Sequence, residues 1–123
     1  MALGKIKADT LEHSTAGSLD TQYVVNGSAK VTIAADDAAV LFKSLNVSSG
    51  VDEGTGDYKY NLTNALTTNT AENPTATCAL GYQTIIRVKT ADATTSVVDV
   101  ESINTSASAT NADQGIAVFG DLA

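Results

Sequence analysis

Apolar and polar residues alternate with a period of two over much of the chain after residue 21, the pattern of strands that bury one face. Tyr23-Val24-Val25 precedes Asn26-Gly27, a dipeptide that favours a tight turn. From Lys30 to Ala34 the alternation places Val31 and Ile33 on one face. We therefore expect strands on both sides of Asn26-Gly27.

A turn at Asp36-Asp37 leads into a stretch that is apolar on both faces. Val40-Leu41-Phe42 predicts a strand covered on both sides. In a domain of this size, another subunit can supply one of the two covers. Val40 and Phe42 are therefore candidate interface residues.

The clearest hairpin lies between Ser44 and Asn64. The residues from Gly50 to Gly56 include three glycines and two acids, which predicts an exposed loop between the two strands. One face of each strand is apolar. The predicted inward residues are Leu45, Val47, Tyr58, Tyr60 and Leu62.

Further short strands are predicted from Thr75 to Leu80, around Ile86, around Val98 to Glu101, and from Ile116 to Phe119. In the third of these, Val98 and Val100 point one way, and Asp99 and Glu101 point the other. About seven to nine short strands, spaced near ten residues apart, indicate an all-β fold, an antiparallel β-sandwich.

The first residues have a different pattern, a mostly polar segment with few apolar residues. Leu3, Ile6 and Leu11 are too few and too unevenly spaced for an amphipathic helix. Such a segment cannot bury enough apolar area to offset its own ordering entropy. We expect residues 1–22 to form an extended arm ordered by a neighbouring subunit or a host particle, and residues 23–123 to form the sandwich. Leu3, Ile6 and Leu11 are the candidate anchors, with Tyr23 and Val24 at the interface.

Charge excludes two classes of partner. The 123 residues carry a net charge of −7, with seven Lys and Arg against fourteen Asp and Glu. Nucleic-acid binders need clustered basic residues to displace counterions from phosphates, so we expect binding neither to nucleic acid nor to an anionic membrane surface. No apolar run approaches the roughly 20 residues needed to span a bilayer, so we also expect no membrane insertion. The single Cys78 cannot form an internal disulfide and is predicted to be a small buried residue.

Catalytic chemistry has little support in this chain. His13 is the only histidine, so neither a zinc site nor a nucleophile–histidine pair can be assembled from the usual residues. We expect no enzyme activity, no cofactor and no metal. Asp52, Glu53 and Asp57 form an acidic loop that either ligates Ca²⁺ or is a solvated turn. The loop from Asn104 to Asn111 is either an adaptable contact surface or a spacer.

Several segments carry a resemblance to a known group of proteins. They include residues 1–11, the run EHSTAGSLD at 12–20 and YVVNGSAK at 23–30, with weaker matches at 44–49 and 54–58 and the terminal GDLA. These segments resemble small fibre- or knob-like virion structural proteins of marine tailed bacteriophages.

The resemblance implies a bacteriophage virion structural protein, a fibre, knob or decoration protein, that forms a homotrimer. Its N-terminal segment would attach to capsid or tail proteins, and its β domain would project outward from the virion. The alternative is a binding tip for a host receptor or carbohydrate, in a calcium-dependent version or otherwise. That alternative would use the loops at 50–57 and 104–114.

Overall fold

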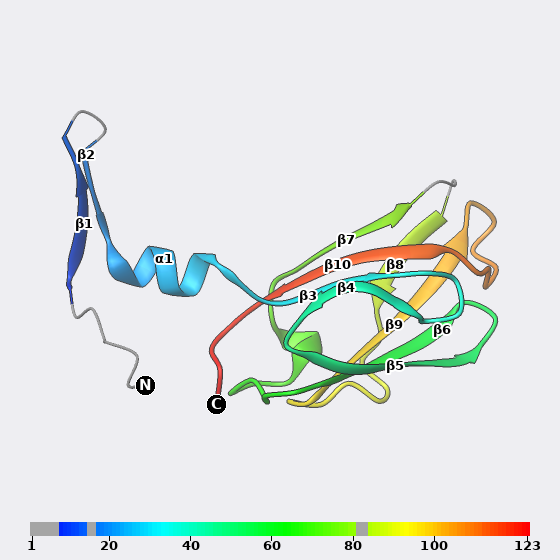
Figure 1. Ribbon diagram of the computed structural model, residues 1–123. Helices are drawn as coiled ribbons and strands as arrows, with labels where there is room; N and C mark the ends of the chain where they lie inside the picture. Colours follow the sequence, from blue (N-terminus) through cyan, green and yellow to red (C-terminus); the bar gives the residue numbers. More distant parts are fainter. Residues whose placement is uncertain (1–7, 15–16, 81–83) are drawn as a thin grey trace.

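The predicted all-β sandwich is confirmed. The computed structural model describes residues 8–14, 17–80 and 84–123. Two antiparallel four-stranded sheets face each other, and a hairpin and a short helix extend from one end (Figure 1). The eight strands of the sandwich are β3 (Ala29–Ala35), β4 (Leu41–Leu45), β5 (Val47–Gly54), β6 (Asp57–Leu62), β7 (Thr75–Leu80), β8 (Thr84–Val88), β9 (Val97–Asn104) and β10 (Asp113–Phe119).

The first sheet has the order β4-β3-β10-β7 and the second has the order β5-β6-β9-β8. The last strand of the chain, β10, therefore pairs with β3 on one side and with β7 on the other. A single turn of 3-10 helix, η1 (Thr70–Glu72), lies in the connection from β6 to β7. Among the described residues, no helix is long and apolar enough to cross a membrane.

The core lies between the two sheets and follows the predicted alternation. In β3, Val31, Ile33 and Ala35 are buried while the residues between them are partly exposed. In β6, Tyr58, Tyr60 and Leu62 are buried in the same alternating way. The remaining members of the buried cluster include Val98, Val100, Ile116 and Val118.

A hydrogen bond between buried side chains connects the sheets. The Tyr60 hydroxyl of β6 donates to Gln114 Oε1 of β10 at 2.8 Å, and both residues are fully buried. The Gln114 amide in turn donates to the Ala112 carbonyl at 3.3 Å. Burial raises the pKa of the Tyr60 hydroxyl, so the phenol stays protonated and remains a donor. The two sheets are thus held in one lateral register by a polar contact inside an apolar core.

The prediction of one continuous strand through Leu45 and Val47 is wrong, because the strand is interrupted at Asn46. Asn46 has a φ of 59°, in the left-handed region, and there the chain passes from the first sheet to the second. The Asn46 side chain accepts from the Asn64 backbone amide at 2.8 Å and donates to the Asn64 carbonyl at 3.0 Å, which fixes the bend. As a result Val47 packs against the core, whereas Leu45 is 54% exposed.

The predicted strand at Tyr23-Val24-Val25 is also wrong, because these residues lie in helix α1 (Thr21–Gly27). None of the described strands pairs with this segment, so its β-branched residues have no sheet to join. Lys30 favours the helical alternative, because its Nζ donates to the carbonyls of Val25 and Ser28 at the helix end.

Two further predictions are wrong, one about burial and one about the length of a loop. Cys78 is exposed rather than buried, because β7 turns Thr77 and Ala79 toward the other sheet instead. The acidic connection before Gly56 is shorter than predicted, since β5 continues to Gly54 and leaves a two-residue turn.

Replacing Tyr60 by Phe tests the contact between the sheets. Tyr60→Phe leaves a buried amide oxygen of Gln114 without its donor, and we expect it to lower the free energy of unfolding by about 1–3 kcal/mol. Urea denaturation measures this loss. Tyr58→Phe is the matched control, because the Tyr58 hydroxyl makes only longer bonds of 3.3 and 3.4 Å, and its loss should be smaller. Equal stability of Tyr60→Phe and the unchanged protein would contradict this role.

Candidate interaction surfaces

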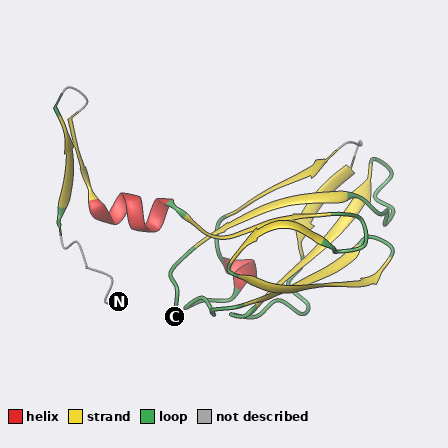
Figure 2. Ribbon diagram, viewed as in Figure 1, coloured by secondary structure: helices red, strands yellow, loops and turns green. Residues whose placement is uncertain are grey.

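The described part of the N-terminal segment forms a small structure of its own, which we call the arm (residues 8–28 without 15–16). Strand β1 (Thr10–His13) pairs antiparallel with β2 (Gly17–Asp20), and helix α1 follows directly. The Thr21 amide donates to the Asp9 carbonyl at 2.9 Å and closes the base of the hairpin. The arm is therefore a hairpin and a helix rather than the predicted extended thread, and it stands away from the sandwich (Figure 2).

Apolar side chains of the arm face solvent. Leu11 is 50% exposed, Val24 is 41% exposed and Val25 is 55% exposed. Two of the predicted anchors, Leu3 and Ile6, lie outside the described residues. Tyr23 lies within α1. The exposed residues of the arm thus have the pattern expected of a segment that another surface covers.

A second exposed apolar region follows the outer strand of the first sheet. We call it the β4 edge and define it by Lys30, Val40, Phe42, Lys43, Leu45 and Leu122. The described residues do not supply the predicted second cover of Val40-Leu41-Phe42: Leu41 packs against the core, while Val40 is 58% and Phe42 62% exposed. The sequence pattern identified Val40 and Phe42. It does not show the bend at Asn46 that exposes Leu45, and it gives no signal for Leu122.

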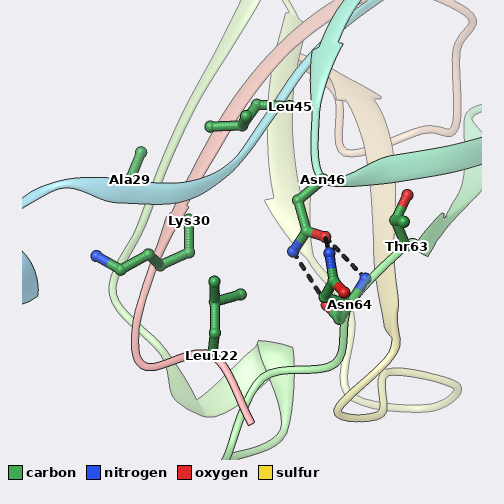
Figure 3. A pocket seen from close by; sticks show the side chains of 7 residues that line it. All are labelled: Ala29, Lys30, Leu45, Asn46, Thr63, Asn64 and Leu122. Atoms are coloured by element: carbon green, nitrogen blue, oxygen red, sulfur yellow. Dashed lines mark hydrogen bonds between the residues drawn. The ribbon is translucent and has the colours of Figure 1, made fainter. Parts of the chain in front are cut away.

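The β4 edge ends in a hollow beside the base of the arm. The hollow has a volume of about 350 Å³. Leu45 and Leu122 line two of its sides, Lys30 borders it from β3, the strand that follows the arm, and the bonded pair Asn46 and Asn64 forms the far side (Figure 3). It is open and mostly apolar, so it suits an apolar side chain of a partner more than a small polar ligand.

The opposite end of the sandwich gathers three connections. The turns from β3 to β4 and from β5 to β6, and the loop from β9 to β10, all lie at the end away from the arm (Figure 1). The Gly56 amide donates to Asn111 Oδ1 at 2.8 Å, which joins two of them. Asn104 Oδ1 accepts from the amides of Ser106 and Ser108 and orders its own loop. The structure thus brings the two predicted contact loops together, with Asn111 as the link.

The acids of the β5–β6 turn do not converge. Asp52 accepts from the Gly54 amide at 2.9 Å, Glu53 pairs with Lys59 at 2.7 Å, and Asp57 pairs with Lys89 at 2.7 Å. In the part of the chain that the structure describes, no three acidic, histidine or cysteine side chains are grouped as a metal site requires. These carboxylates are engaged by lysines and by their own turn, which weakens the calcium-dependent alternative.

Asp99 is a buried charge that the sequence pattern placed on a solvent face. Its side chain is fully buried, its Oδ2 accepts from the Asp92 amide at 3.1 Å, and its Oδ1 has no hydrogen-bond partner among the described residues. Lys89 Nζ lies 3.8 Å from Oδ1 but is bonded to Asp57. Burial raises the pKa of the Asp99 carboxyl above its ordinary value. The flanking valines in Val97-Val98-Asp99-Val100 are the signal that could have indicated burial on both faces.

Comparison with known proteins finds no relative. The chain matches no protein-family model, no curated protein and no solved structure.

Asp99→Asn tests the buried carboxylate through pH. Because its pKa is raised in the folded state, Asp99 stabilises the fold less and less as pH increases from about 4 through the raised value. The variant lacks this titration, so its free energy of unfolding relative to the unchanged protein should rise with pH. Denaturation curves from pH 3 to 8 measure the trend.

Asp92→Asn is the matched control with the opposite sign. Lys59 lowers the pKa of the Asp92 carboxyl, so this group contributes stability above its unfolded pKa and loses it as pH falls. Relative to the unchanged protein, Asp92→Asn should lose stability as pH rises through about 4. Parallel curves for the two variants would contradict the assignment of Asp99.

Proposed function

We propose that this chain is a non-enzymatic structural protein of a bacteriophage virion, a fibre, knob or decoration protein. The N-terminal arm joins it to neighbouring subunits and to capsid or tail proteins, and the sandwich projects from the particle. The observation that carries the proposal is the separation of the arm, with its exposed Leu11, Val24 and Val25, from a sandwich that is complete without it. The resemblance of residues 1–30 to phage virion proteins supports the same role.

The difference between the two ends of the sandwich supports this arrangement. The arm and the C-terminus lie toward one end of the sandwich, and the joined loops at Gly56 and Asn111 lie at the other (Figure 1). A subunit attached through the arm would therefore present those loops outward. Association as a homotrimer would supply the missing cover of the exposed apolar residues and add stability to a small core.

A second candidate function is a binding tip for a host receptor or carbohydrate. The bond between Gly56 and Asn111 favours it, because it combines two loops distant in sequence into one surface at the projecting end. This function is compatible with a virion location and adds a contact with the host cell surface. Its calcium-dependent version has the weaker support, since Lys59 and Lys89 engage Glu53 and Asp57.

Incorporation into particles tests the structural role. In a phage that carries the chain, we expect purified virions to contain it, and Leu11→Asp/Val24→Asp to reduce its copy number at least about tenfold, because charged residues at exposed apolar contacts oppose docking. Quantitative mass spectrometry of the particles measures the copy number. Ile85→Asp is the matched control, since Ile85 is 57% exposed on β8, away from the arm. Virions without the chain, or with unchanged amounts of the arm variant, would contradict the proposal.

Thermal unfolding with added ligands separates the two functions. With 5 mM Ca²⁺, we expect no rise in Tm beyond that produced by Mg²⁺, because the loop acids are already engaged. Host surface polysaccharide should raise the Tm only if the distal loops form a binding tip, and Asn111→Ala should then abolish the rise. A calcium-specific rise lost in Asp52→Asn would contradict our reading of the acidic turn.

A further inference from the structure

We propose that the arm of one copy docks on the β4 edge of a neighbouring copy. This inference rests on the proposed role of the arm in assembly and names its partner surface. The two surfaces are complementary in apolar exposure, in charge and in backbone hydrogen bonding, and each lacks a partner within the described part of its own chain.

The distribution of basic side chains indicates which surface the arm binds. Residues 29–123 contain five basic side chains, and Lys59, Arg87 and Lys89 form ion pairs on the second sheet. The other two, Lys30 and Lys43, both belong to the β4 edge, and neither forms an ion pair within the described residues. Lys30 Nζ already donates to the carbonyls of Val25 and Ser28, so Lys43 is the cation of the β4 edge that is left for an acidic partner.

The arm carries the opposite charge. Residues 8–28 contain Asp9, Glu12 and Asp20 and no Lys or Arg, although Lys5 and Lys7 precede them. Glu12 is the acid next to Leu11, just as Lys43 is the cation next to Phe42. Docking would therefore place a carboxylate and an exposed apolar side chain of the arm against an ammonium and an exposed apolar side chain of the edge.

Backbone groups favour the same pairing. Strand β4 ends the order of the first sheet, so one side of it has no neighbouring strand. In the two-stranded sheet of the arm, β1 and β2 each have one free side as well. An exposed edge strand with apolar side chains is a template for strand addition, and a lysine on such an edge limits unselective pairing. An acidic hairpin satisfies both the free backbone groups and Lys43.

The arm cannot use the edge of its own subunit without losing contacts. Lys30 Nζ bonds the Val25 and Ser28 carbonyls and holds α1 in line with the start of β3. The linking residue Ser28 is extended, with φ −89° and ψ 138°. Folding the hairpin back would break these bonds, whereas a neighbouring copy can present its edge to the arm as it stands. Such a contact joins different surfaces of the two copies, and it forms a ring when the rotation between copies closes, as in the homotrimer proposed above.

Charge exchange in the full-length chain tests the proposal. Glu12→Lys and Lys43→Glu should each weaken self-association at least about tenfold, and the double variant should recover most of it. Sedimentation velocity over a concentration series gives the dissociation constants, and circular dichroism verifies the fold. Glu72→Lys, an exposed site on η1, is the control for the change in net charge.

Mixing two defective chains provides an independent test. Leu11→Asp/Val25→Asp lacks a competent arm, and Phe42→Asp/Leu45→Asp lacks a competent edge, so each should be monomeric alone. Their mixture should form a one-to-one pair, since one chain keeps its edge and the other its arm. Native mass spectrometry identifies this species, and Ile85→Asp should associate normally.

Each outcome decides the proposal. Monomeric unchanged protein, normal association of the edge variant, or no recovery in the double variant or the mixture would overturn it. These measurements use purified chain alone, so loss of the arm–edge contact is distinguishable from failure of the virion role, which the particle experiment tests separately. Absence from virions with intact arm–edge association would overturn the proposed function and leave this inference standing.

Discussion

The structure depends on the inward faces of two small sheets, and the contact that fixes them is the bond between Tyr60 and Gln114. Aromatic residues make up only 5% of the chain, so the two buried tyrosines of β6 supply much of the volume between the sheets. Their hydroxyls need partners in an apolar interior, and Gln114 and the backbone around Ala112 provide them. A polar contact in this position specifies how the sheets align, which valines and isoleucines alone would leave less defined.

A core of this size stabilises the sandwich but leaves other apolar residues uncovered. The outer strand β4 exposes Phe42 and Leu45, and the arm exposes Leu11 and Val25. Neither surface is required for the contacts inside the sandwich, so both are available for association. The proposed function follows from this division: the interior determines the fold, the arm and the β4 edge would connect subunits, and the loops at the opposite end would face outward.

The sequence predicted the fold class well because period-two alternation reports burial directly, as in Val31 and Ile33 or Tyr58 and Tyr60. It failed where a single residue redirects the backbone or where tertiary contacts override local preference. Asn46 in the left-handed region moves the chain between sheets, and no alternation pattern shows that. Lys30 stabilises the end of a helix whose valines favour strands. Asp99 is buried because both faces of its strand are covered at this position. The alternation pattern assumes that only the face with Val98 and Val100 is covered.

The mass of the purified protein in solution, measured by light scattering, tests whether these exposed surfaces connect copies of the chain. A homotrimer joined by the arm and the β4 edge has about three times the 12.6 kDa of one chain. Its mass should fall toward that of one chain as salt is raised, because the arm and the edge carry opposite charges. A stable species of 12.6 kDa at all concentrations would contradict association through these surfaces.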